Sequence, residues 1–189
     1  MSDEPFHILA FSGSLRQHSF NSGLLRAAQQ VTPDHVVIEI HHLGDIPLYD
    51  ADVEAAGVPE PVRAFAEKIR AADAVLIATP EYNYSFPGVL KNAIDWVSRP
   101  AVQTPLRRKP VAIMGAAGGQ WGTVRAQLHL RQVLASAIEA YTLVKPEVMV
   151  PRAGSVFDDH GNLEDDDVRD RVRALVEALV DWARRLEDE

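Results

Sequence analysis

The sequence predicts an α/β fold, a doubly wound five-stranded parallel sheet with helices on both faces. Short apolar runs alternate five times with segments of helical periodicity, and this alternation is typical of parallel sheets covered by helices. The run at residues 74–78 has no polar position, which indicates an interior strand buried on both faces. No linker or repeat interrupts the alternation, and 189 residues suit one core, so we expect a single domain over residues 1–189.

Five strands are expected in chain order. The first covers residues 7–11, the second residues 35–41 and the third residues 74–78. The fourth covers residues 111–114, and a fifth lies within residues 143–150. Each run is short and apolar and is bounded by polar residues or breakers, as buried parallel strands are.

Five helices are marked by apolar residues three or four positions apart. They are expected around residues 24–31, 62–69, 88–97, 130–138 and 168–186. Pro87 opens the third helix at little cost, because its missing N–H would be unpaired in the first turn anyway. Residues 43–61 hold several prolines and glycines, so we expect a long loop there, of the kind that often has a function.

Composition and charge exclude several kinds of partner. The net charge of −8 argues against nucleic-acid binding and against attachment to an anionic membrane. The N-terminal segment has no basic stretch followed by a long apolar one, so we expect no signal peptide, no membrane span and a cytoplasmic protein. The absence of cysteine excludes disulfides, thiolate metal sites and cysteine nucleophiles. His41 and His42 lack a third ligand, so no metal is expected, and redox chemistry would need a bound organic cofactor.

Unusual loops follow three of the expected strands, the first, the third and the fourth. The carboxyl ends of parallel strands meet at one edge of a doubly wound sheet, and ligands bind in the crevice beyond that edge. We therefore expect the three loops to converge on one site, although each loop alone is also compatible with an ordinary strand-to-helix connection.

The loop after the first strand suits a phosphate. Ser14, Arg16, Ser19 and Asn21 place small polar side chains and a guanidinium at a helix N-terminus, where free amides and the helix dipole favour an anion. The segment matches neither GxGxxG nor the nucleotide-hydrolysing GxxxxGK(S/T) loop, so a monophosphate fits better. Alternatively, Ser19 or Asn21 merely caps the helix, but a cap gives Arg16 no role.

The other two loops suit a flat ligand. Residues 81–85 form a polar connection with backbone amides available before the next helix. In the loop after the fourth strand, Gly115, Gly118, Gly119 and Gly122 allow close approach of the backbone and positive φ. A flexible connection would also explain these glycines.

Three segments together resemble the NADPH-dependent FMN reductase family, which has a flavodoxin-like fold. They are GSLRQHSFNSGLL at residues 13–25, PEYNYSFPGVLKNAIDWVSRP at residues 80–100 and GAAGGQWGTVRAQLHLRQVL at residues 115–134. The second segment is long and specific, and the first is specific in combination with it. The resemblance covers nearly the whole chain and is greatest to the small quinone, chromate and azo-compound reductases.

The resemblance implies a set of FMN-binding positions. Those that match the phosphate site are Ser14, Arg16, Ser19 and Asn21. Those that match the loop along the flavin edge are Pro80, Glu81, Tyr82, Asn83 and Ser85. Those that match the second flavin-contacting loop are Gly115, Ala116, Ala117 and Gly118. Tyr84 departs from the family pattern, since relatives often have a smaller residue or His there.

The implied function is that of an FMN-dependent oxidoreductase with NADPH or NADH as co-substrate. Electrons would pass through bound FMN to small acceptors such as quinones, with free flavin, azo or nitro compounds and chromate as further candidates, by a ping-pong mechanism. The flavin carries the hydride, so no catalytic side chain is expected, and Glu81 is expected to have a structural role near a helix start. The resemblance also implies a homodimer or homotetramer.

Two other functions remain open from the residues. One is a flavodoxin-type electron carrier without NAD(P)H reductase activity of its own, and the other is a flavin-free sensor of a phosphate ligand. The carrier is the second choice, because the loop from Ser14 to Asn21 is unlike the Thr/Ser/Gly-rich phosphate loop of flavodoxins.

Overall fold

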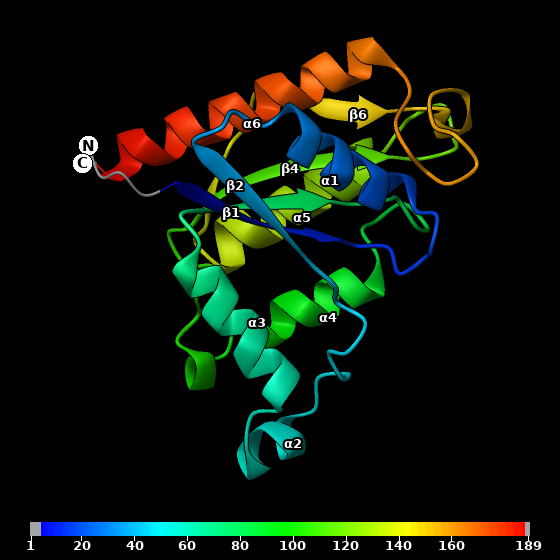
Figure 1. Cartoon of the computed structure of the whole chain (residues 1–189). Helices are drawn as coiled ribbons and strands as arrows, with labels where there is room; N and C mark the ends of the chain where they lie inside the picture. The colour runs from blue at the N-terminus through cyan, green and yellow to red at the C-terminus, as the bar shows by residue number, and fades with distance from the viewer. Residues whose placement is uncertain (1–4, 188–189) are drawn as a thin grey trace.

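The computed structural model describes residues 5–187 and contains one parallel sheet (Figure 1). Residues 1–4, part of the segment in which no signal peptide is expected, lie outside the described residues. The strand order is β2-β1-β3-β4-β5, with β6 also paired to β4, and every ladder is parallel. The strands are β1 (Phe6–Ser12), β2 (Val36–His41), β3 (Ala74–Ala78), β4 (Pro110–Ala116), β5 (Tyr141–Thr142) and β6 (Val148–Val150). The predicted doubly wound parallel sheet is confirmed.

The expected fifth strand is divided into two pieces. β5 pairs with the start of β4, Pro110 opposite Tyr141, and β6 pairs with its end, Met114 opposite Val148. Pro146 lies between the two pieces. Because proline has no N–H to donate, it interrupts a ladder of hydrogen bonds, and the edge of the sheet is divided at this point.

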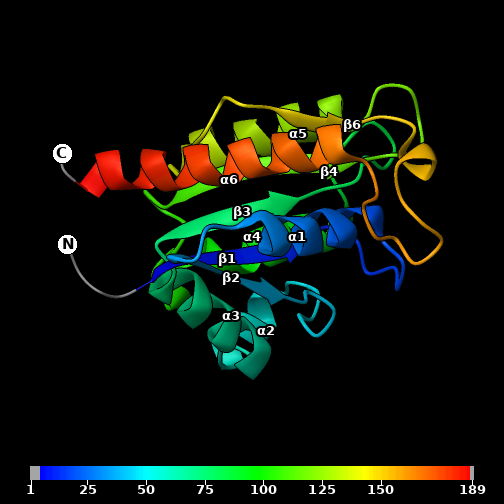
Figure 2. The same cartoon turned by 45° about the horizontal axis from the view of Figure 1, so that its top comes forward.

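Helices cover both faces of the sheet. Alternate residues along a strand point to opposite faces, so Ile8 and Ala10 join one core while Leu9 and Phe11 join the other. Figures 1 and 2 show α1 and α6 on one side of the sheet and α3, α4 and α5 on the other. The bounds are α1 (Phe20–Val31), α3 (Glu60–Ala71), α4 (Gly88–Val97), α5 (Val124–Gln132) and α6 (Asp166–Glu187).

Shorter helical segments complete the fold. A π-helical turn, η2 (Val133–Ala137), continues α5, and two 3-10 turns are η1 (Pro100–Val102) and η3 (Ala153–Ser155). A short helix, α2 (Ala51–Ala56), lies where the sequence predicts only loop, so that part of the prediction is wrong. Asp50 caps α2 by accepting a hydrogen bond from the amide of Asp52 at 2.8 Å. None of the α2 residues is buried, and an apolar periodicity that would have revealed the helix is therefore missing.

The loop between β2 and α3 is fastened to α4. The carbonyl oxygen of Pro47 accepts hydrogen bonds from Asn92 Nδ2 and Trp96 Nε1, both at 2.8 Å. The amide of Tyr49 donates to Asn92 Oδ1 at 2.8 Å, and its hydroxyl donates to Glu54 at 2.8 Å. Asn92 and Trp96 therefore hold this loop, and the Tyr49 hydroxyl is already paired.

Across the described residues, no helix is both long and apolar enough to cross a bilayer. Residues 5–187 also contain no group of three or more His, Cys, Asp or Glu side chains arranged to bind a metal ion.

His41 connects the edge strand β2 to α3. Its ring stacks on that of Phe65, with the centroids 4.8 Å apart and the planes inclined by 10°. Burial, followed by the nearby charge of Lys68, lowers the pKa of His41 below its ordinary value of 6.5. The folded protein therefore binds a proton at His41 less readily than the unfolded chain does, and stability rises with pH wherever that difference exists.

We expect acid to destabilise the protein partly through His41. As the pH falls from about 8 to about 5, the unfolded chain takes up this proton first, so the free energy of unfolding decreases. The loss begins near pH 6.5 and is complete below the lowered pKa of the folded state. Urea denaturation over this range measures the decrease, and His41→Phe, which keeps the stacking on Phe65 but cannot titrate, should show a smaller decrease. An equal decrease in both proteins would contradict this role of His41.

Candidate functional site

The three unusual loops meet at one edge of the sheet. β1, β3 and β4 are adjacent and parallel, with Ser12 opposite Ala78 in the register. The amide of Gly13 donates to the carbonyl of Ala78 at 2.9 Å, and the amide of Thr79 donates to that of Met114 at 3.0 Å. The strands therefore end at one level, as Figures 1 and 2 show. The chain adds β2 on one side of β1 and the later strands on the other side, so the topological switch point lies between β1 and β3.

The loop after β1 leads into the N-terminus of α1. Ser19 is buried and caps α1, because its Oγ accepts a hydrogen bond from the amide of Ser22 at 3.4 Å. Ser14 Oγ accepts from the amide of Arg16 at 3.4 Å, while the side chain of Arg16 is exposed. Among the described residues, no acceptor faces the amides of Gln17 and His18. The loop thus offers free N–H donors, a helix N-terminus and a guanidinium in one place.

Asn21 ties the first loop to the third. Its Nδ2 donates to the carbonyl of Ala116, and its Oδ1 accepts from the amide of Ala116, both at 2.9 Å. The side chain is 3% exposed, so this pair of bonds is formed away from water. The structure therefore uses Asn21 to fix the distance between α1 and the end of β4.

The second loop is fixed through Glu81. Its carboxylate accepts hydrogen bonds from the amides of Arg125 and Ala126, at 3.0 Å and 3.2 Å, at the start of α5. The same carboxylate forms an ion pair with the guanidinium of Arg125, and the Glu81 side chain is 7% exposed. These contacts agree with the expected structural role of Glu81 near a helix start.

The residues after Glu81 form a two-residue hairpin turn. The amides and carbonyls of Tyr82 and Ser85 bond to each other at 2.9 Å and 3.0 Å, and Asn83 and Tyr84 between them both have positive φ. Ser85 Oγ and His129 Nδ1 on α5 lie 3.1 Å apart, within hydrogen-bond distance. Tyr82, Asn83 and Tyr84 are exposed at this edge of the sheet.

Glycines have different roles in the third loop. A Cβ atom at Gly115 would lie 2.2 Å from Thr123 Oγ1 and 2.3 Å from the carbonyl oxygen of Thr79, so only glycine fits between β3 and α5. Gly122 has φ +58, which favours glycine. Gly118 instead faces open space, with no atom within 4 Å of an added Cβ.

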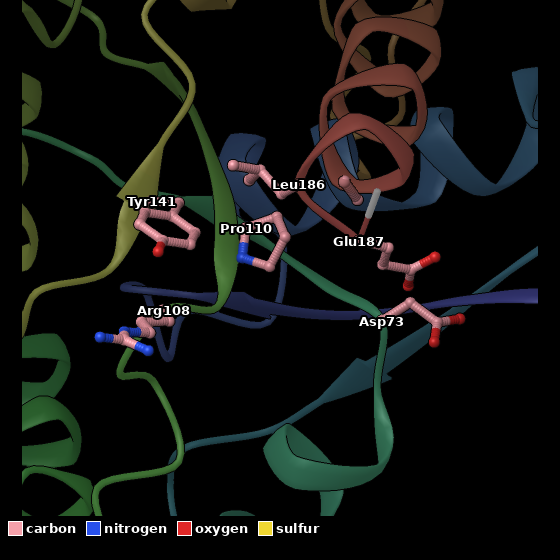
Figure 3. Close-up of a pocket in the computed structure, with 7 residues that line it drawn as sticks. Asp73, Arg108, Pro110, Tyr141, Leu186 and Glu187 are labelled. Atoms are coloured by element: carbon pink, nitrogen blue, oxygen red, sulfur yellow. The ribbon is translucent and has the colours of Figure 1, made fainter. Parts of the chain in front are cut away.

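A hollow at the opposite edge of the sheet is a different feature. It has a volume of about 540 Å³ and lies at the amino ends of β3 and β4, beside the end of α6 (Figure 3). Asp73, Arg108 and Glu187 bring charges of both signs to its wall. Arg107 and Arg108 therefore lie at the other end of β4 from the three loops.

Two residues that hold the second loop, Arg125 and His129, could not be recognised from the sequence as part of the site. Arg125 lies 44 positions from Glu81, and its guanidinium lies 3.9 Å from the ring centroid of Tyr84. Each of these contacts joins residues from different loops and helices. No local sequence pattern indicates these contacts. The one available signal was that both partners lie in the segments that resemble the family, residues 80–100 and 115–134.

The arrangement fits a flat ligand that carries a phosphate. The free amides and Arg16 lie where a phosphate would sit, while the exposed turn and the open side of Gly118 leave room along the same edge. In sheets of this strand order FMN binds at the switch point between β1 and β3, and here the first loop begins at that point.

Comparison with known proteins identifies the family. The family model of NADPH-dependent FMN reductases matches residues 6–155. An NAD(P)H-dependent FMN reductase of Pseudomonas aeruginosa is 51% identical over 186 residues, which cover 98% of this chain and 99% of that protein. A quinone reductase of Escherichia coli is 45% identical over 165 residues, covering 82% of this chain and 87% of that protein.

A solved structure supports the same assignment. FerB, an NAD(P)H:(acceptor) oxidoreductase from Paracoccus denitrificans, superimposes with a TM-score of 0.85 at 33% identity, over 95% of this chain and 98% of FerB. The family model spans most of the chain, and both reductases exceed 40% identity over nearly their whole length. The chain therefore belongs to the NADPH-dependent FMN reductase family of oxidoreductases.

Proposed function

We propose that this enzyme transfers electrons from NADPH or NADH to quinones through FMN bound at the carboxyl edge of β1, β3 and β4. The main support for this FMN site is that the three loops converge, with free amides beside Arg16 at the end proposed for the phosphate. The assignment of NAD(P)H and quinones as substrates is supported by two relatives, one named an NAD(P)H-dependent FMN reductase and the other a quinone reductase.

The loop after β1 would hold the FMN phosphate. Arg16 supplies a charge-assisted contact, and the amides of Gln17 and His18 supply N–H donors at the positive end of α1. Ser14 and Ser19 line the same loop, with Ser19 also capping the helix. Asn21 contributes by holding this loop against Ala116.

The second and third loops would hold the flavin ring. FMN held there would supply the redox chemistry, the transfer of a hydride from the nicotinamide and of electrons to the acceptor. The amides of Asn83, Tyr84 and Gly118, which have no acceptor among the described residues, would orient the ring. Ala116 and Ala117 would set the position of Gly118, because their backbones are bonded to Asn21, Val150 and Ala153. Tyr82 and Ser85 close the turn that follows Pro80 and Glu81. The carboxylate of Glu81 already accepts hydrogen bonds from the amides of Arg125 and Ala126, so we assign it a structural role and propose no catalytic side chain.

The nicotinamide and the acceptor would use the bound flavin in turn, which would give a ping-pong mechanism. Free flavin, azo or nitro compounds and chromate are further acceptors to test. We also propose a single FMN-binding domain over the whole chain, and a cytoplasmic location, where NAD(P)H is supplied.

We further propose that the enzyme is a homodimer or homotetramer. Apolar side chains stand exposed around the site and on α5, namely Tyr84 at 69%, Trp121 at 61% and Leu128 at 58% exposure. Such a group favours contact with a second copy of the chain.

Anaerobic titration with NADPH tests the function. We expect the visible absorption of the FMN-loaded enzyme to bleach with NADPH and to recover when a quinone is added. Steady-state rates at several fixed quinone concentrations should give parallel double-reciprocal lines. A flavin that binds but stays oxidised would favour the electron-carrier alternative, and intersecting lines would exclude ping-pong kinetics.

Arg16→Ala tests the phosphate end of the site. We expect the dissociation constant of FMN to rise about tenfold, the usual effect of losing one charge-assisted contact. Riboflavin lacks the phosphate and provides the control, so its affinity should not change. A partly exposed arginine on α6, Arg173, gives a control variant, Arg173→Ala, that should leave both affinities unchanged. Equal losses for FMN and riboflavin would place the phosphate away from Arg16.

Two glycine variants separate ligand contact from packing. Gly118→Val should raise the dissociation constant of FMN about tenfold with little change in the stability of the flavin-free protein, because its side chain enters open space. Gly115→Ala should destabilise the flavin-free protein by about 2 kcal/mol or more, because its Cβ meets Thr123 and Thr79. Thermal unfolding and FMN titration of both variants provide the two measurements, and a Gly118→Val protein with normal FMN affinity would contradict the ring placement.

A further inference from the structure

The turn at residues 82–85 contains a tyrosine in an unfavourable backbone conformation. Asn83 has φ +49 and Tyr84 has φ +67, and the hydrogen bond from the Ser85 amide to the Tyr82 carbonyl closes the turn. This pattern of two positive φ values is that of a type I′ turn, in which Asn-Gly is the preferred pair. Asn tolerates the left-handed region well, whereas a bulky residue such as Tyr does so at a cost.

Three contacts hold this turn against α5. Glu81, just before the turn, caps the helix at Arg125 and Ala126. The ring of Tyr84 faces the guanidinium carbon of Arg125 at 3.9 Å. Ser85, at the end of the turn, lies 3.1 Å from His129. Arg125 takes part in two of the three contacts.

Arg125 is suited to make both contacts at once. One edge of its planar guanidinium faces the Glu81 carboxylate, while its face covers the Tyr84 ring. The side chain of Glu81 is 7% exposed and that of Arg125 is 32% exposed, so water screens the pair less than it screens an ordinary surface pair. Lysine carries the charge but lacks the flat face and the fork of donors.

We propose that Arg125 is a positioning residue for the flavin reaction, which holds the turn at residues 82–85 in its left-handed conformation through Tyr84. This inference rests on the proposed placement of the flavin edge along that turn. Within the described part of the chain, no acceptor faces the amides of Asn83 and Tyr84, so the turn presents both donors to the ligand edge. If the turn relaxes to negative φ, these two N–H groups change direction and the flavin loses them.

The flavin-free protein gives the first test. In Arg125→Met, the amides of Tyr82 and Ser85 should exchange with deuterium about tenfold faster, because the hairpin opens more often. Tyr84→Gly creates the sequence Asn-Gly, which adopts this turn without assistance. In that background, Arg125→Met should change the exchange rates by less than about threefold.

FMN binding gives the second test. Arg125→Met should raise the dissociation constant of FMN about tenfold in the natural sequence and by less than about threefold in the Tyr84→Gly background. Arg125→Lys should recover only part of the affinity, because the ring contact needs the planar group. Arg173→Met is the matched control and should change neither the exchange rates nor the affinity.

The outcomes separate this inference from the proposed site. Equal effects of Arg125→Met in the two Tyr84 backgrounds would overturn the positioning role, because Arg125 would then act only through Glu81. Unchanged exchange and affinity would overturn it as well. Faster exchange with unchanged FMN affinity would show that Arg125 holds a turn that the flavin does not use, and this result would overturn the flavin placement together with the inference.

Discussion

The whole site depends on the parallel register of three neighbouring strands. β1, β3 and β4 pair so that Ser12, Ala78 and Met114 lie near one level, and each strand then leads into a loop. Apolar residues on both faces fix this register, since a shift by one residue would exchange the two cores. Asn21 adds a cross-link from α1 to the backbone of Ala116, on the far side of β3. The loops therefore keep their relative positions without any bound ligand.

Within the loops, side chains and backbone have separate tasks. Ser19 caps α1, Asn21 bonds to Ala116, and Glu81 caps α5, so each of these polar side chains is paired within the protein. In the same loops, the amides of Gln17, His18, Asn83 and Tyr84 have no acceptor among the described residues. Buried polar side chains need such partners, and the bonds they form restrict the backbone to one conformation. The polar side chains of this motif therefore shape the loops, and the proposed ligand would contact mainly backbone amides.

The sequence predicts elements well where burial is complete and poorly where it is not. β3 matches its predicted bounds because every residue is apolar, and Pro87 marks the start of α4 correctly. α2 has no buried residue, and the division between β5 and β6 depends on one proline at a sheet edge. In the site, the loops could be located from their residues, but the bond from Glu81 to Arg125 joins positions 44 apart and exists only in the folded chain.

The exposed aromatic side chains at this edge bear on how two substrates can share one site. Tyr82, Tyr84 and Trp121 leave between 48% and 69% of their surface open in the single chain. Aromatic faces of this kind are normally covered by a flat ligand or by another protein surface. A ring held along one edge by backbone N–H groups keeps a face free, and a nicotinamide and a quinone are both flat enough to occupy that face in turn. Under the proposed ping-pong mechanism, two flat substrates would cover this edge in turn, whereas an isolated carrier would leave the same aromatic faces in water, which is unfavourable.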